Sequence, residues 1–279
     1  MFKKRIFFFD VDGTLYSETH ATILPQTKKL ILALSKKPNT ILGIATGRNY
    51  RHLNVLEELF PLFKYFILCN GAITIANKSS FFENKHQLIS KTPIPSEHIE
   101  HIMEWITKYQ YKILPFSVGF NAEACFSNGH IENINLFKEW KKHMSKKNIA
   151  FDSVNIDNSF HWNNEIFILY IFGEDRSRID FEKISEKCFN KYNWSSHMDL
   201  IAKNVNKFVG IQKIYHQYPD YELICVGDGC NDHEMLKFSD IGIAMGNSKF
   251  KHIKTIADFV TPHIDENKIY DFFEQNKLL

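Results

Sequence analysis

Cysteine is scarce and unpatterned in this chain. Its five cysteines form an odd set in which no C-x-x-C pair occurs. The count argues against a disulfide framework, and the spacing argues against a structural zinc site. Cys69 and Cys225 lie in apolar runs and are interpreted as small core residues. We therefore expect a protein of a reducing compartment, the cytoplasm.

Glycine, proline and long apolar runs are also in short supply. With only 12 Gly and 8 Pro but 44% apolar residues, the composition excludes a low-complexity or disordered chain. The apolar run Ile6–Phe9 stops at Asp10, which is too early for a signal peptide. No run approaches the roughly 18 residues of a membrane-spanning helix, so we expect no membrane association.

A strong excess of one charge is missing as well. The net charge is +2 and the pI is about 8.1, so no nucleic-acid partner is predicted. Phenylalanine, in contrast, is abundant, with 25 copies among 279 residues. These rings can fill a large core or an interface equally well, so the composition predicts no particular oligomeric state.

The two flanks of the chain alternate between short apolar runs and helical patterns. Such alternation is typical of an open parallel sheet. Strands are expected at Ile6–Phe9, Thr40–Ala45, Tyr65–Cys69, Leu223–Val226 and Ile241–Met245. Helices are expected from Pro25, near Tyr50–Leu59, after Asn206 as N-cap, and around Asp232–Phe238.

The middle of the chain has a different pattern, with amphipathic helices at His98–Tyr109 and Leu136–Met144. A short aromatic strand at Ile166–Phe172 lies beyond them, and no strand here ends in a polar-glycine motif. We therefore interpret residues 84–192 as an inserted α/β domain. Residues 1–83 and 193–279 together form the other domain.

Polar residues follow the expected strands of the flanks. In an open α/β sheet, ligands bind outside the carboxyl ends of the strands, so these side chains are expected to gather there. The set comprises Asp10, Asp12, Thr46, Asn70, Asp228, Asn231 and Asp232. Asp10 and Asp12 are two residues apart on an expected extended segment, which directs both side chains the same way. Such a cluster of carboxylates needs a hard cation, and oxygen ligands favour Mg²⁺, which commonly takes a substrate phosphate as a further ligand.

Two further features suit phosphate binding. Thr46 and Gly47 form a strand-end turn whose hydroxyl and N–H groups can bind a phosphate oxygen, although for the pair taken alone a helix N-cap is the favoured interpretation. Lys207 begins an expected helix, where a cation is unfavourable for the helix dipole and so suggests a use. Lys203 is the competing lysine.

Four ordered motifs in this chain resemble those of the haloacid dehalogenase superfamily. They are Asp10-Val11-Asp12-Gly13-Thr14, Thr46-Gly47-Arg48, Lys207, and Gly227-Asp228-Gly229-Cys230-Asn231-Asp232. The Asn70-Gly71 pair and the run Gly242–Asn247 are similar to those of the Cof-type phosphatases of this superfamily. One departure is Phe208, since the family often has Gly after the motif lysine. The resemblance implies a doubly wound, mostly parallel α/β core, Rossmann-like, with an inserted α/β cap that selects the substrate.

The resemblance also implies roles for individual residues. Asp10 would be the nucleophile and a Mg²⁺ ligand, and Asp12 the general acid/base, with its backbone carbonyl on the metal. Asp228 would be the third metal ligand, and Asp232 would hold a metal-bound water. The phosphoryl oxygens would be bound by the Val11 amide, Thr46, Gly47, Lys207 and Asn231.

The implied activity is Mg²⁺-dependent hydrolysis of a small phosphate monoester through an aspartyl-phosphate. Sugar phosphates, pyridoxal phosphate and flavin mononucleotide are the substrate types that this family suggests. A phosphotransferase or phosphomutase using the same aspartyl-phosphate is the first alternative. A phospho-regulated binding protein of the receiver kind is the second, but such proteins are much shorter and have no cap. In the inserted domain, the polar segment Ser159–Glu165 is either a substrate-contacting segment or an exposed hairpin.

Overall fold

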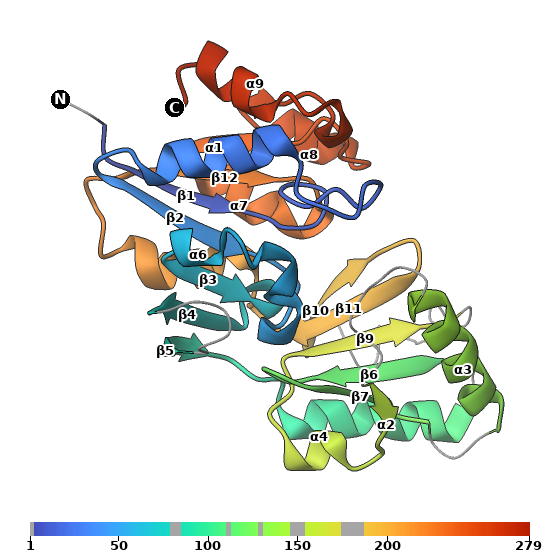
Figure 1. Cartoon of the computed structure of the whole chain (residues 1–279). Helices are drawn as coiled ribbons and strands as arrows, with labels where there is room; N and C mark the ends of the chain where they lie inside the picture. The colour runs from blue at the N-terminus through green and yellow to red at the C-terminus, as the bar shows by residue number, and fades with distance from the viewer. Residues whose placement is uncertain (1–2, 79–84, 110–112, 128–130, 146–153, 174–186) are drawn as a thin grey trace. The chain divides into compact units, whose positions relative to one another are not determined.

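The chain forms two compact units in the computed structural model, which describes residues 3–78, 85–109, 113–127, 131–145, 154–173 and 187–279 (Figure 1). The first unit consists of Met1–Arg48, Leu53–Lys91 and Asn206–Leu279. The second consists of Asn49–His52 and Thr92–Val205. Both boundaries lie further along the chain than the predicted ones after residues 83 and 192, the first of which lies outside the described residues.

The boundaries shift because strand pairing decides which unit each segment joins. The strand β5 (His86–Lys91) pairs with β4 (Ile73–Asn77) and so belongs to the first unit. The strand β11 (His197–Ala202) pairs with β9 (Ile168–Phe172) and so belongs to the second. A further difference is the four-residue segment Asn49–His52, which no sequence pattern assigned to the second unit.

The first unit is built on an eight-stranded sheet of order β14-β13-β12-β1-β2-β3-β4-β5. Its other strands are β1 (Arg5–Phe9), β2 (Thr40–Ala45), β3 (Tyr65–Leu68), β12 (Glu222–Gly227), β13 (Ile241–Ala244) and β14 (Phe259–Val260). The six strands from β14 to β3 are parallel. The strands β4 and β5 were not predicted from the sequence, and β4 pairs antiparallel with both β3 and β5. The mostly parallel α/β sheet is therefore confirmed.

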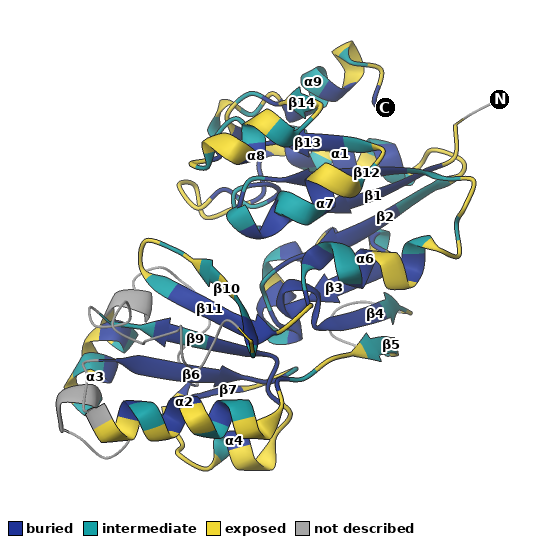
Figure 2. Ribbon diagram, turned by 180° about the vertical axis from the view of Figure 1, so that it is seen from behind, coloured by how far each residue is buried: buried dark blue, intermediate teal, exposed yellow. Residues whose placement is uncertain are grey.

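Helices cover both faces of this sheet, which explains why its central strands are continuous apolar runs. They are α1 (Pro25–Ser35), α6 (Lys207–Tyr215), α7 (His233–Phe238), α8 (Lys251–Ile256) and α9 (Ile269–Gln275). Ile6 and Phe8 of β1 join one core with residues of α6, α7 and α8, whereas Phe7 contacts Phe273 of α9. Figure 2 shows the result, since β1 and β12 are buried almost along their whole length.

The helix expected near Tyr50–Leu59 is a 3₁₀-helix that ends at Leu56. Its bonds reach three residues back, as from Glu57 N–H to the Asn54 carbonyl at 3.1 Å. The apolar spacing favoured an α-helix, but the first residues of this segment are held in one unit and the rest in the other. Tertiary contacts thus override the local pattern here. Four more 3₁₀ turns occur in the part of the chain that the structure describes, namely Phe60–Leu62, Cys69–Gly71, Cys230–Asp232 and Ile264–Glu266.

The second unit has its own six-stranded sheet, of order β10-β11-β9-β6-β7-β8. Its remaining strands are β6 (Leu114–Val118), β7 (Glu123–Cys125), β8 (Asn155–Ile156) and β10 (Phe189–Asn193). All its pairs are antiparallel except β7 with β8. The helices among the described residues of this unit are α2 (Ser96–Tyr109), α3 (Ile131–Ser145) and α4 (Phe160–Asn163), so both predicted helices and the α/β character are present.

The amphipathic helices of the second unit pack as their periodicity predicts. On α2 the buried side chains are Ile99, Ile102, Met103 and Ile106. On α3, Trp140 lies against Phe116 of β6 with ring centroids 4.4 Å apart. Neither these helices nor any other within the described ranges is long and apolar enough to cross a membrane.

Candidate active site

The carboxyl ends of four parallel strands of the first unit carry the predicted site residues. Asp10 directly follows β1, Thr46 follows β2, and Asp228 follows β12. The backbone holds these positions, because the Asp10 N–H donates to the Val226 carbonyl at 2.9 Å and the Thr46 N–H to the Ile67 carbonyl at 2.9 Å. Asn70 lies in the 3₁₀ turn after β3. The gathering of these residues at one sheet edge therefore follows from parallel strand pairing.

Lys207 lies between two carboxylates at this edge. Its Nζ donates to Asp10 Oδ1 at 2.8 Å and to Asp232 Oδ1 at 2.6 Å, and its side chain is fully buried. Burial alone would lower the pKa of Lys207, but the two carboxylates outweigh it and raise that pKa. They also compensate for the unfavourable position of a cation at the first residue of α6. The competing Lys203 is exposed, so the structure brings Lys207 and not Lys203 into the cluster.

Asp232 is a central acceptor of the cluster and is itself fully buried. While its Oδ1 accepts from Lys207, its Oδ2 accepts from the backbone N–H groups of Asp228 and Gly229 at 2.9 and 2.8 Å. A Cβ on Gly227 would lie 2.4 Å from the same Oδ2, so only glycine fits there. Asp232 therefore positions Lys207 and shapes the turn that presents Asp228.

Three carboxylates meet at this point. Asp10, Asp228 and Asp232 each offer an oxygen, and these atoms lie within 4.8 Å of one another. Burial raises the pKa of Asp10 to about 7. The positive charge of Lys207 opposes this rise, whereas the negative charges of Asp232 and Asp12 add to it. Burial and the charges of Asp10 and Asp232 raise the pKa of Asp228 well above its ordinary value. Oxygen ligands with excess negative charge fit a hard divalent cation such as Mg²⁺.

Asp12 is not part of this three-carboxylate cluster. Its two carboxylate oxygens accept from Arg48, Oδ2 from Nε at 2.8 Å and Oδ1 from Nη2 at 2.7 Å. Burial alone would lower the pKa of Arg48. The negative charge of Asp12 and this bidentate pairing outweigh the effect of burial, so the pKa of Arg48 is raised. The expectation of one extended segment was wrong, because β1 ends at Phe9 and the chain bends at Val11. The two acids consequently have separate cationic partners.

Arg48 was not predicted to have a role of its own, although it stands in the second motif. The available signal was its position, since an arginine three residues after the end of β2 lies at the polar edge of the sheet. Its backbone is also held there, because Arg48 N–H donates to Thr46 Oγ1 at 3.2 Å and its carbonyl accepts from Cys69 N–H at 3.0 Å. The two strand-end loops therefore support each other.

Asn231 and Asn70 form a buried amide pair. Nδ2 of Asn231 donates to Asn70 Oδ1 at 2.8 Å, while Oδ1 of Asn231 is buried without a partner among the described residues. Gly47, another predicted phosphate-binding residue, is close to the pair, since a Cβ there would lie 3.2 Å from Asn70 Oδ1. Asn70 itself has a positive φ of 56°, a conformation that asparagine tolerates better than most residues.

The turn after β1 is shaped by glycine and by neighbours that the sequence did not indicate. Gly13 has a φ of +75°, and a Cβ there would lie 2.4 Å from Asp228 Oδ2. The carbonyl of Val11, whose amide is a predicted phosphate ligand, accepts from three following N–H groups. Ser248, which no pattern predicted, donates its hydroxyl to the Asp228 carbonyl at 2.6 Å. These contacts hold Asp228 beside Asp10.

The segment Ser159–Glu165 of the second unit contains the short helix α4 and is not a hairpin. Its His161 is buried against Phe126, whereas Trp162 is 58% exposed. Burial lowers the pKa of His161. Both side chains line a cavity of about 420 Å³ together with acidic residues of α2. A contact of this segment with a substrate stays a prediction.

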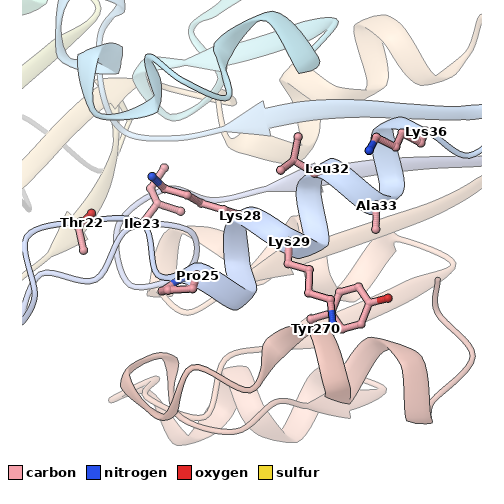
Figure 3. A pocket seen from close by; sticks show the side chains of 9 residues that line it. All are labelled: Thr22, Ile23, Pro25, Lys28, Lys29, Leu32, Ala33, Lys36 and Tyr270. Carbon is pink, nitrogen blue, oxygen red and sulfur yellow. The ribbon is translucent and has the colours of Figure 1, made fainter.

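A larger cavity, of about 840 Å³, lies on the first unit along α1 (Figure 3). Three lysines and Tyr270 of α9 help to line it, and Lys29 Nζ lies 3.6 Å from the centre of the Tyr270 ring. None of the predicted site residues is among its lining residues. The candidate active site is therefore defined by the polar strand ends and not by this cavity.

Comparison with known proteins agrees with this geometry. A family model described as haloacid dehalogenase-like hydrolase matches residues 7–273. "Putative phosphatase YkrA" of Bacillus subtilis (strain 168) is 28% identical over 271 residues, which cover 95% of each chain. "5-amino-6-(5-phospho-D-ribitylamino)uracil phosphatase YitU" of the same organism is 23% identical over 282 residues, covering 98% of this chain and 97% of that protein.

The fold is shared with solved structures. The HAD subclass IIB sugar phosphatase BT4131 superposes with a TM-score of 0.81 at 24% identity, over 99% of this chain and 100% of that chain. At 24% identity this likeness shows that the two chains share a fold. It agrees with the two sheets described above.

Proposed function

The chain belongs to the haloacid dehalogenase-like hydrolases and is a phosphatase of that family, and from this premise we propose that it hydrolyses a small phosphate monoester through a phosphorylated Asp10. The observation that carries the proposal is the contact of Asp10 with Lys207 at a strand end where two further carboxylates converge. A buried carboxylate beside a cation is suited to approach an anionic phosphoryl group, because the cation reduces the repulsion.

We further propose that Mg²⁺ is the metal. Asp10 and Asp228 would hold it through their carboxylates, Asp12 through its backbone carbonyl, and Asp232 through a bound water. When bound, the ion supplies positive charge that offsets the negative charge of the phosphoryl oxygens. The convergence of three carboxylates, two of which share the single positive charge of Lys207, supports the proposal, since such oxygen ligands suit a hard divalent cation.

The chain's own residues account for the two chemical steps. In the first, an Asp10 carboxylate oxygen bonds to phosphorus, the bond from phosphorus to the leaving oxygen breaks, and Asp12 gives that oxygen a proton. In the second, Asp12 takes a proton from water, the water oxygen bonds to phosphorus, and Asp10 is released. Lys207, Thr46, Gly47, Asn231 and the Val11 amide would bind the phosphoryl oxygens.

The proposed substrate is a small phosphorylated metabolite, such as a sugar phosphate, pyridoxal phosphate or a flavin mononucleotide-like ester. The relative YitU is named for a phosphoribitylamino-uracil, which also belongs to the class of small phosphate esters. A cytoplasmic location and the lack of nucleic-acid and membrane partners stay predictions from composition. The assignment of the second unit to substrate selection is likewise a prediction.

The test is phosphate release from a panel of small phosphomonoesters, with and without Mg²⁺, for the wild-type protein and for Asp10→Asn. We expect metal-dependent turnover that falls by at least about 10³-fold in the variant, because the nucleophile is lost. A second assay adds a sugar as phosphoryl acceptor. Phosphoryl transfer to that sugar in place of phosphate release would favour the phosphotransferase alternative, and a stable phospho-Asp10 without turnover would refute the hydrolase proposal.

A further inference from the structure

Glu123 is a buried acid that the proposed chemistry does not use. It lies in β7, next to β6 in the sheet of the second unit, and its side chain is only 1% exposed (Figure 1). Burying a carboxylate is costly unless it is paired and hydrogen-bonded. Its partners therefore indicate what the acid is for.

The partners of Glu123 come from the segment Asn49–His52. Oε1 lies 2.7 Å from His52 Nε2, and Oε2 accepts from Asn49 Nδ2 at 3.3 Å. Asn49 Nδ2 also lies 3.3 Å from the Gly119 carbonyl. Both carboxylate oxygens of Glu123 are thus engaged by one short segment that is distant in the sequence.

Tyr50 strengthens the attachment of this segment. Its N–H donates to the Phe120 carbonyl at 3.1 Å, and its ring stacks on the Phe120 ring with centroids 5.2 Å apart. The loop between β6 and β7 therefore holds the segment through the backbone, an aromatic pair and a buried ion pair. No other part of the second unit comes from before Thr92.

The same segment continues directly into the first unit at both ends. The residue before it is Arg48, which binds both oxygens of Asp12. The residue after it is Leu53, which is fully buried. Neighbouring Cα atoms are about 3.8 Å apart, so Asn49 has little freedom to move without moving Arg48.

We propose that Glu123, acting through His52 and Asn49, is a positioning residue that sets the place of Arg48 and so the orientation of the Asp12 carboxylate. The inference rests on the proposed function, in which Asp12 is the acid that protonates the leaving oxygen. Anchored by Glu123, the strand-end loop holds the Arg48 guanidinium against Asp12. Without the anchor, the arginine and the acid lose their common orientation, although every reacting group is still present.

The test compares Glu123→Met with Asp199→Leu as matched control. Asp199 is also a buried acid of the second unit, paired with His197 at 3.1 Å and with Trp194 at 3.0 Å, and neither of these partners belongs to the segment Asn49–His52. For each variant, kcat/KM is measured with the sugar phosphate that the wild-type protein turns over fastest and with p-nitrophenyl phosphate. The aryl leaving group is weakly basic and needs little protonation, so it is insensitive to a misplaced acid.

We expect Glu123→Met to lower kcat/KM for the sugar phosphate about tenfold more than for p-nitrophenyl phosphate, since small misplacements of a catalytic group have effects of this size. Asp199→Leu should leave the ratio of the two values within about twofold. If Glu123→Met does not fold, Asn49→Ala replaces it, with a smaller drop of about threefold expected for its fewer contacts. An unchanged ratio in a folded variant overturns the proposal.

A readout without turnover separates this inference from the proposed function. The Nε–H resonance of Arg48, assigned with Arg48→Lys, should exchange slowly with water in the wild-type protein and in Asp199→Leu, and faster in Glu123→Met. If the wild-type protein releases no phosphate from any ester, the proposed function fails, and this measurement decides on the positioning role. Equal protection of that resonance in wild type and Glu123→Met overturns the proposal.

Discussion

At the scale of single residues, the candidate site works by imbalance of charge. One buried lysine faces three carboxylates, of which Asp10 and Asp232 contact it directly. Such a buried cluster contributes little to the free energy of unfolding, because the desolvation of each charge opposes the attraction between the charges. Its persistence in the interior is more readily explained by the chemistry that perturbed carboxylates support.

The raised pKa of Asp10, about 7, predicts how metal binding depends on pH. A protonated carboxyl is a poor ligand, so Mg²⁺ affinity should rise by up to about tenfold per pH unit below 7 and level off above it. Calorimetric titrations between pH 5.5 and 8.5 measure this, and they should show proton release near neutral pH. Affinity that is constant over this range would contradict the assignment of Asp10 as a ligand.

The raised pKa of Asp10 also determines how the stability of the metal-free protein depends on pH. The folded-state pKa of Asp10 lies above its ordinary value of about 4, so between about pH 4 and pH 7 the folded state binds more protons than the unfolded state. The contribution of Asp10 to the free energy of unfolding therefore falls as pH rises through this window, and bound Mg²⁺ should oppose the fall.

At the scale of elements, α6 shows how a local signal places a functional side chain. Asn206 precedes the helix and its Oδ1 accepts from Val209 N–H at 2.8 Å, as the N-cap prediction required. The helix start then fixes Lys207 one residue later. Close packing of this start on the turn after β3 requires Gly71, where a Cβ would lie 1.9 Å from the Asn206 carbonyl oxygen.

Removing the cap should therefore weaken the first unit. Asn206→Ala is expected to lower the free energy of unfolding by about 1 kcal/mol, because one helix N–H loses its acceptor. Urea unfolding followed by far-UV circular dichroism measures the change. Asn54→Ala, at an exposed position of the same unit, serves as control and should change stability by less than about 0.5 kcal/mol. Equal effects of the two substitutions would argue against a capping role.

At the scale of the whole molecule, the chain builds two units with separate sheets and separate cores. The tryptophans are distributed unevenly between them. All four, Trp105, Trp140, Trp162 and Trp194, lie within the range 92–205 of the second unit. Tryptophan fluorescence therefore reports on the second unit, whereas circular dichroism reports on both.

This distribution predicts two distinguishable unfolding transitions. Mg²⁺ at about 100 times its Kd should stabilise the first unit by about 2.7 kcal/mol, because the proposed ligands all belong to that unit. We expect the metal to shift the circular-dichroism transition that lacks a fluorescence change and to leave the fluorescence transition in place. One coincident transition that shifts as a whole would show instead that the units unfold together.

The sequence by itself determined the parallel core strands, the helix start at Lys207 and the residues of the strand ends, because these depend on local apolar runs, caps and turns. It also determined the family, through motifs whose order is readable without a fold. It did not reveal β4 and β5, whose pairing is not recorded in any local pattern, or the true boundaries of the two units.

Only the tertiary structure decided which side chains act together. Spacing along the chain placed Asp10 and Asp12 side by side, whereas the fold pairs Asp10 with Lys207 and Asp12 with Arg48. It also attached the segment Asn49–His52 to Glu123, some seventy residues away, through a buried pair. Such contacts join residues that are distant in sequence, and their energies depend on burial and on distance, which become defined only when the chain is folded.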